Sequence, residues 1–312
     1  MPQTSPFRYA DDNKRYHTLN YYNKHRFGGR IYKAVLDGGF TCPTIDGTKG
    51  FGGCDFCDGG SGAFTKPLPL PEQLALERER IHKQNANARI IAYFQAHTCT
   101  YGEPSHLREL YETALAAPDV IGLSIGTRPD CLPEDVLSLL AELNGRTHLT
   151  VELGLQTAHD ATADLFGRGY PYTVFLHSYE RLQKLGIRTC IHLIDGLPGE
   201  RIEDMVETAR IVGKLRPQAV KLQLLHILEG TRYATLWREG SIRPMEQADY
   251  IETVVQQLAV LPPETVIERL TGDGEKSRLL APQWSMDKIR TLGSIDKRMA
   301  ELDLVQGEDF RQ

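Results

Sequence analysis

Six short, largely apolar segments recur along the chain, separated by longer stretches of mixed polarity. The apolar segments span residues 31–36, 88–94, 120–125, 148–153, 187–194 and 219–225. Apolar residues in the other stretches recur at a spacing near 3.6, which predicts helices over 72–86, 105–116, 133–143, 172–185, 203–214 and 246–259. Alternation of this kind predicts βαβ units in an α/β fold with a parallel sheet.

The pattern fits two architectures, a doubly wound open sheet and an incomplete (β/α) barrel. Both place their chemistry on the loops that follow the carboxyl ends of the strands, so the polar residues there are the ones to inspect. A further strand-like segment, residues 265–270, follows Leu261-Pro262-Pro263. No repeat or Ser/Pro-rich linker divides the chain.

Composition narrows the class of protein. The 312 residues are 41% hydrophobic and carry 36 Lys and Arg against 41 Asp and Glu, which excludes a collagen, a disordered chain and a coiled coil. The N-terminus lacks the features of a signal peptide, and no apolar run approaches the roughly 18 residues that cross a bilayer. We therefore expect a cytoplasmic protein with no membrane contact.

Positive charge is concentrated near the N-terminus. Residues 1–35 hold seven Lys and Arg against Asp11 and Asp12, and tyrosines lie among them. That mixture can neutralise phosphates and stack bases, as nucleic-acid-binding segments do. The alternative is a solvated surface segment on a mildly acidic body. Residues 1–29 are predicted to form this basic, tyrosine-rich arm.

Three of the six cysteines gather in a glycine-rich loop after the first predicted strand. Cys42 is followed by eleven residues, Cys54, and then Cys57. A structural zinc site normally needs four protein ligands, whereas an iron–sulfur cube held by three cysteines leaves one iron open to substrate or cofactor. Cys99, Cys131 and Cys190 are read as small buried hydrophobes. A role for Cys99 as a fourth ligand or redox thiol is a minor alternative.

The cysteine loop and several later motifs resemble the radical S-adenosylmethionine (SAM) superfamily. The motifs are LDGGFTCP (36–43), GGCDFC (52–57), GTRPDCLP (126–133), ELGLQT (152–157), GLPGE (196–200), LHILEGT (225–231) and RLTGDG (269–274). The usual spacing in that superfamily is CxxxCxxC. The longer first gap is similar to the elongator-catalytic-subunit-like branch and to the bacterial YhcC/YtqA-type group.

This resemblance implies a fold, cofactors and a reaction type. The fold is a partial (β/α)6 TIM-like barrel of parallel strands over 30–262, with a C-terminal extension over 263–312. The cofactors are a [4Fe-4S] cluster, ligated by Cys42, Cys54 and Cys57, and SAM. An electron from the cluster cleaves SAM to a 5′-deoxyadenosyl radical, which abstracts a hydrogen from the substrate.

Residues that contact SAM also carry over by resemblance, motif by motif. They are Phe56 beside the adenine, and Gln95, Thr127, Glu152, Gln156, Arg168 and His192. Two departures stand out, because the glycines expected after the second strand are missing and Gly126 replaces a ribose-binding Glu. In the alternative reading Glu152 and Gln156 cap helices, Arg168 lies on the surface and His192 is a core histidine.

Polar residues at strand ends and in the turn after 265–270 form the set of predicted substrate contacts. They are His97, His226, Glu229, Arg232, Arg269, Asp273 and Lys276. Charged groups at a barrel mouth need partners or a ligand, so these residues are candidates for substrate binding.

The resemblance, together with the basic arm, favours an enzyme that acts on tRNA. The similar groups imply chemistry on the C5 side chain of the wobble uridine, with a carboxymethylaminomethyl substituent converted toward aminomethyl. Only about 50 residues follow Pro263, so no acetyltransferase domain is expected. Implied partners are an electron donor such as flavodoxin or ferredoxin, and a separate methyltransferase acting downstream.

Two other functions remain open on the sequence alone. One is a radical SAM dehydrogenase or decarboxylase of a small anionic metabolite. The other is an iron–sulfur electron-transfer module, which would leave Gln156, Arg168 and His192 without a purpose.

Overall fold

A single parallel sheet organises the molecule. The computed structural model describes residues 7–57, 68–95, 97–272 and 276–311. Seven strands pair in the order β1-β2-β3-β4-β5-β6-β8, and every pair is parallel. They are β1 (Ile31–Leu36), β2 (Arg89–Phe94), β3 (Val120–Thr127), β4 (His148–Gln156), β5 (Arg188–Asp195), β6 (Ala219–Leu224) and β8 (Val266–Arg269). The sheet curves into a half-barrel, so the predicted partial barrel is confirmed and the doubly wound alternative is wrong.

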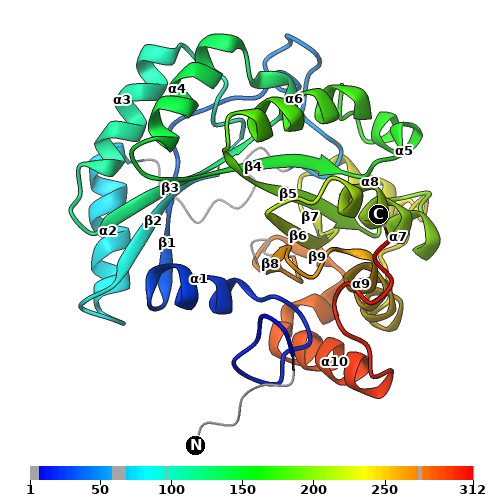
Figure 1. Ribbon diagram of the computed structural model, residues 1–312. Coiled ribbons are helices and arrows are strands. Elements are labelled where there is room, and N and C mark those ends of the chain that lie inside the picture. The colour runs from blue at the N-terminus through cyan, green and yellow to red at the C-terminus, as the bar shows by residue number, and fades with distance from the viewer. Residues whose placement is uncertain (1–6, 58–67, 96, 273–275, 312) are drawn as a thin grey trace, which may run out of the picture.

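Helices connect successive strands, as parallel pairing requires. Figure 1 shows α2, α3, α4 and α6 following one another along the outside of the sheet. The helices that the pattern predicted are α2 (Leu70–His82), α3 (Pro104–Leu115), α4 (Glu134–Asn144), α6 (Tyr172–Lys184), α7 (Ile202–Lys214) and α9 (Gln247–Val260). Helices that it missed are α1 (Leu19–Phe27), α5 (Asp160–Leu165), α8 (Arg232–Arg238) and α10 (Lys288–Glu301).

Helix α4 shows how local sequence sets an element. Pro133 precedes it, and Glu134 and Asp135 occupy its first turn, where a negative charge stabilises the helix by interacting with its dipole. Its buried residues recur on one face and pack into the main core. They are Val136, Leu137, Leu139, Leu140 and Leu143.

The N-terminal segment closes the lower end of the half-barrel. Thr18 caps α1 by accepting a 3.1 Å hydrogen bond from the Tyr21 amide, and Gly28 ends it at φ 75°. Before the helix, the carbonyl of His17 accepts a 2.8 Å hydrogen bond from the Ile267 amide in β8. Helix α1 therefore lies across the sheet near its two edge strands, at the bottom of Figure 1.

The C-terminal extension contributes to the same sheet. Strand β8, the strand-like segment noted in the sequence, pairs with β6, so the predicted division at residue 262 does not interrupt the pairing. A small antiparallel pair, β7 (Ile227–Leu228) and β9 (Leu279–Ala281), lies beyond it. None of the helices in the described ranges is both long and apolar enough to cross a membrane.

Candidate functional site

A cavity of about 310 Å³ opens at the carboxyl ends of the strands, where the fold places chemistry. Cys42, Cys54 and Cys57 all line it. The seven residues predicted to contact SAM line it as well, and they come from the cysteine loop, from four different strands or strand ends, and from the loop after residues 160–165. They are Phe56, Gln95, Thr127, Glu152, Gln156, Arg168 and His192.

The cysteine loop is tied to the segment that follows β4. The Asp55 amide donates a 3.0 Å hydrogen bond to the Phe166 carbonyl, and the Cys54 thiol donates to the Gly167 carbonyl at 3.7 Å. A turn joins Cys54 to Cys57 through a 2.7 Å hydrogen bond from the Cys57 amide. Burial, with a smaller effect of Cys57, raises the pKa of Cys54 to about 12. This thiol is therefore neutral at pH 7 unless a positive group stabilises its ionised form.

The three thiols fit an iron–sulfur cluster better than a single metal ion. Among the described residues, no group of three or more His, Cys, Asp or Glu side chains converges closely enough to hold one ion. A cubic cluster instead takes each thiolate on a different iron, so its ligands surround it at separate points. Three separate cysteines that line one cavity meet that requirement.

Two lining residues hold a left-handed backbone conformation that is uncommon outside glycine. His97, after β2, has φ 60°, and Gln156, at the end of β4, has φ 66°. Gln156 also lies at an irregularity in the pairing of β4 with β5. Its side-chain amide nitrogen packs against Gly154, and a Cβ added to Gly154 would lie only 2.6 Å from that nitrogen. The imidazole Nδ1 of His97 is buried with no hydrogen-bond partner in the described structure. Strain and an unpaired polar atom are both typical of ligand-binding positions.

Arg168 is 1% exposed and is held by the protein itself. Its guanidinium donates to the carbonyls of Tyr170, Leu155 and Thr157 at 3.0, 2.8 and 2.6 Å, and to Oδ1 of Asp160 at 2.8 Å. Arginine has five N–H donors, so one remains for a ligand. The side chain thus fixes the loop after β4 from within the cavity wall.

Glu152 lies at the centre of a buried polar network in the cavity floor. Its carboxylate accepts hydrogen bonds from Lys33 (2.9 Å), Ser124 (2.5 Å), Tyr93 (2.9 Å) and His192 (2.7 Å), and also from Lys221. Burial alone would raise the pKa of Glu152, but the ammonium groups of Lys221 and Lys33 outweigh it and hold the pKa well below its usual range. Burial and Lys221 lower the pKa of His192, so this imidazole is neutral at pH 7.

Several members of this network were not among the predicted site residues, although the sequence contains an indication of each. Lys33 and Lys221 are single charged residues within the largely apolar strands IYKAVL and AVKLQLL, and Glu268 lies beside Arg269 in TVIERL. Charged side chains are rarely buried without a partner. One such residue in each of several adjacent strands therefore predicts a polar cluster inside the barrel.

The structure brings together only part of the predicted substrate set. His97, His226 and Arg269 line the cavity. Arg232 does not, because its exposed side chain lies 3.6 Å from the Asp55 carboxylate. Glu229 pairs with Arg238 outside the cavity, and Lys276 is exposed on the surface. Asp273 lies outside the described residues.

Two models of known protein families match the two halves of the chain. Residues 48–212 match the model of the radical SAM superfamily, and residues 217–301 match that of the radical SAM C-terminal domain. Cys54 and Cys57 lie inside the first match, and Cys42 lies just before it.

Relatives cover the full chain. The uncharacterized protein YtqA of Bacillus subtilis is 44% identical over 100% of this chain and 98% of its own length. Protein YhcC of Escherichia coli is 36% identical over 88% of this chain and 89% of its own. The tRNA uridine(34) acetyltransferase of Methanocaldococcus infernus is 27% identical over 49% of this chain, which spans 29% of that protein.

The fold comparison agrees with these matches. Elp3 from Methanocaldococcus infernus superposes with a TM-score of 0.67 at 18% identity, over 88% of this chain and 64% of that one. The chain thus spans less than two thirds of the solved Elp3 chain. The resemblance read from the cysteine loop and later motifs is confirmed: the chain belongs to the radical SAM superfamily and is a radical SAM enzyme, with a [4Fe-4S] cluster and SAM as its cofactors.

Proposed function

We propose that Cys42, Cys54 and Cys57 ligate three irons of the cluster, and that SAM occupies the adjoining cavity. The observation that carries this proposal is that all three cysteines and all seven predicted SAM contacts line one cavity. When bound, the cluster supplies the electron that cleaves the S–C5′ bond of SAM.

The lining residues take two kinds of role in this proposal. Phe56, Gln95, Thr127 and Gln156 face the cavity and bind SAM. Arg168, Glu152 and His192 are engaged with protein groups, so they act mainly as positioning residues. Arg168 holds the loop behind the cysteines, and Glu152 holds Lys33 and Lys221 under the cavity floor.

For the substrate we infer a tRNA, modified on the C5 side chain of its wobble uridine. Support comes from the similarity to the tRNA uridine(34) acetyltransferase and to Elongator complex protein 3 over half of the chain. His97, His226 and Arg269 line the cavity and are the residues proposed to contact the uridine side chain. A flavodoxin or ferredoxin as electron donor and a downstream methyltransferase belong to the same proposal.

The first experiment measures 5′-deoxyadenosine. Protein reconstituted anaerobically with iron and sulfide is incubated with SAM and dithionite, and the product is quantified by chromatography and mass spectrometry. Wild-type protein is expected to form it. Cys54→Ala is expected to lose cluster iron and to form at least 100-fold less 5′-deoxyadenosine, because an iron without its thiolate is released. Cys131→Ala is the matched control, since Cys131 is buried but does not line the cavity.

The same assay separates the substrate classes. Wobble-modified tRNA is expected to accelerate 5′-deoxyadenosine formation and to lose mass on its uridine side chain, as conversion of carboxymethylaminomethyl toward aminomethyl requires. Acceleration by a small anionic metabolite but not by tRNA would contradict the tRNA proposal and leave the cofactor site intact. A fully loaded cluster that never cleaves SAM, with or without tRNA, would contradict both.

A further inference from the structure

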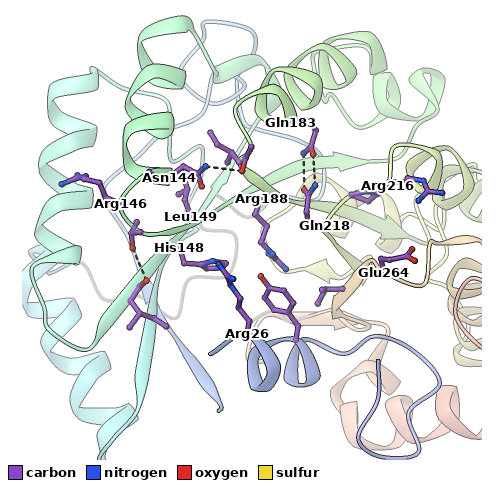
Figure 2. Close-up of a pocket in the computed structure, with 18 of the residues that line it drawn as sticks. Arg26, Asn144, Arg146, His148, Leu149, Gln183, Arg188, Arg216, Gln218 and Glu264 are labelled. Atoms are coloured by element: carbon purple, nitrogen blue, oxygen red, sulfur yellow. Dashed lines mark hydrogen bonds between the residues drawn. The ribbon is translucent and has the colours of Figure 1, made fainter. Parts of the chain in front are cut away.

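A second cavity, of about 940 Å³, lies at the opposite end of the barrel (Figure 2). It is lined by the residues that begin β4, β5, β6 and β8, and by one face of α1. Its polar and aromatic lining includes Tyr22, Arg26, His148, Arg188, Arg216 and Glu264. None of the residues assigned to the cluster or SAM reaches it, so it needs a separate explanation.

Arg188 brings positive charge to the floor of this cavity. It donates to Glu268 at 2.9 Å and to Thr150 at 3.1 Å, and its guanidinium lies 4.8 Å from the centre of the Tyr22 ring. Its Nη2 is buried and has no hydrogen-bond partner in the described parts of the chain. An arginine nitrogen in that state favours an additional acceptor.

The carboxylates nearby do not balance this charge. Glu268 is shared between Arg188 and Lys33, and Lys33 is shared in turn with Glu152, which also binds Lys221. Three cations therefore face two buried carboxylates. Glu264 also lines the cavity, but it is half exposed and lies 3.5 Å from Arg8.

Arg26 adds a second cation from the other side. Figure 2 shows it reaching from α1 toward His148, next to Arg188. It forms no ion pair or hydrogen bond with any residue that the structure describes. Burial, then the charges of Arg188 and Arg26, lower the pKa of His148 to about 4, so the imidazole between them is neutral at pH 7. Two guanidinium groups thus converge where an anion would relieve their repulsion.

Most of the other cations in residues 1–35 form ion pairs within the molecule. Lys14 pairs with Asp296, Arg15 with Asp303, Lys24 with Asp11, and Arg8 and Lys33 with the glutamates named above. Arg30 stacks on Tyr32 at 4.8 Å. Among the described residues of 1–35, Arg26 and Arg30 are thus the cations without an ion pair, and Arg26, though exposed, lines the cavity.

We propose that this second cavity binds a backbone phosphate of the RNA substrate, an inference that rests on the tRNA assignment above. The two cavities lie toward opposite ends of β4: the lining of the first extends from Gln156 to Glu152, and that of the second includes His148. Between four and eight steps of about 3.3 Å, roughly 13 to 26 Å, therefore separate them. The ion pairs of Lys33 with Glu152 and Glu268 lie between the two cavities, so a small substrate held near Gln156 does not extend into the second. An RNA strand spans such a distance with about four to eight stacked nucleotides at ~3.4 Å each, and each nucleotide carries a phosphate.

The test is tRNA binding measured by fluorescence anisotropy over a range of salt concentrations. Arg26→Gln is expected to weaken binding about 3- to 10-fold and to reduce the slope of log affinity against log salt by about one, the signature of one lost phosphate contact. Arg89→Gln is the matched control. Arg89 is exposed at the start of β2, at the same end of the sheet, and does not line the cavity. It is expected to leave both affinity and slope unchanged.

The other outcomes separate the two proposals. If wild-type protein binds tRNA and Arg26→Gln binds it equally well with the same slope, the phosphate site is overturned and the tRNA assignment stands. If wild-type protein binds no tRNA, both are overturned. If adenosine monophosphate binds in an Arg26-dependent way while tRNA binding does not depend on Arg26, the cavity is a site for a free nucleotide, the backbone-phosphate site is overturned and the tRNA assignment stands.

Discussion

Asp195 ends β5 and is 1% exposed, and its Oδ1 accepts a 2.6 Å hydrogen bond from the Gln257 side chain in α9. The second oxygen of Asp195 and the amide oxygen of Gln257 are both buried without a partner in the described structure. Burial raises the pKa of Asp195 to about 7, with a further rise from Glu200 that the Gln257 hydrogen bond opposes. A proton on the carboxyl lets the acid and the amide satisfy each other.

The stability of the protein is therefore expected to depend on pH through Asp195. The unfolded carboxyl ionises near pH 3.8, whereas the folded one keeps its proton up to about pH 7. The contribution of Asp195 to the free energy of unfolding is thus greatest below pH 4 and falls as the pH rises to 7, by on the order of 4 kcal/mol. Asp195→Asn is expected to remove that slope and to be more stable than wild type at pH 8. Denaturant unfolding at pH 5 to 8 measures it.

Asp164→Asn serves as the control, because Asp164 is exposed on α5 and its replacement should leave the pH profile as in wild type. An Asp195→Asn protein with an unchanged slope between pH 5 and 7 would show that Asp195 is ionised in the folded state.

At the scale of elements, close approach of backbones fixes how β3 meets β4. Gly122 in β3 pairs with His148, and a Cβ on Gly122 would lie 2.3 Å from the His148 carbonyl oxygen. Real side chains do not tolerate that distance to backbone, so the two strands would have to separate. Gly122→Ala is expected to destabilise the protein by at least about 3 kcal/mol, in the range of severe overpacking. Thermal unfolding measures it.

Gly102→Ala is the matched substitution, because its added Cβ would meet only the Leu107 side chain at 3.6 Å, an ordinary contact. A change in melting temperature as small in Gly122→Ala as in Gly102→Ala would contradict the account of the β3–β4 pairing.

Sequence patterns predicted the strands and helices that are buried on one face or on all sides. Strands β1 to β6 and the helices α2, α3, α4, α6, α7 and α9 were located to within a few residues, because each carries a run or stripe of apolar side chains. Helix α1 escaped because none of its residues is fully buried, and α5 and α8 are too short to show a period.

The candidate site was only partly visible for a related reason. Cysteine spacing and the later motifs named residues that one cavity gathers, since each motif is local in sequence. The second cavity depends on Arg26 and Arg188 meeting from elements 162 residues apart, and no local pattern encodes such a meeting. Nothing in the sequence around Arg168 indicates that its N–H groups donate to backbone carbonyls.

On the scale of the whole molecule, Gln306 joins the two ends of the chain. Its side chain is 6% exposed, accepts a 2.9 Å hydrogen bond from the His17 amide and donates to the carbonyls of Pro262 and Thr265 at 2.7 and 2.8 Å. Gln306→Ala would leave three backbone groups without a side-chain partner. It is expected to cost about 2–4 kcal/mol of stability and to speed amide exchange at His17 first.

A Gln306→Glu protein keeps the acceptor for His17 and loses the donor to the two carbonyls, which separates the two halves of the contact. Unchanged exchange at His17 in Gln306→Ala, measured by hydrogen–deuterium exchange, would show that the arm is held by other contacts.

The ion pair of Lys14 with Asp296 and the hydrogen bond of His17 with Gln306 join residues 282 and 289 positions apart. During synthesis the first strands are made long before their final neighbours, and contacts of such separation form late in folding. The contact with Gln306 can therefore form only after about residue 306 has left the ribosome. A chain interrupted earlier would carry all three cysteines but would hold the arm, and Arg26 with it, through fewer contacts, so translation of the residues that follow α10 sets the moment at which the second cavity is completed.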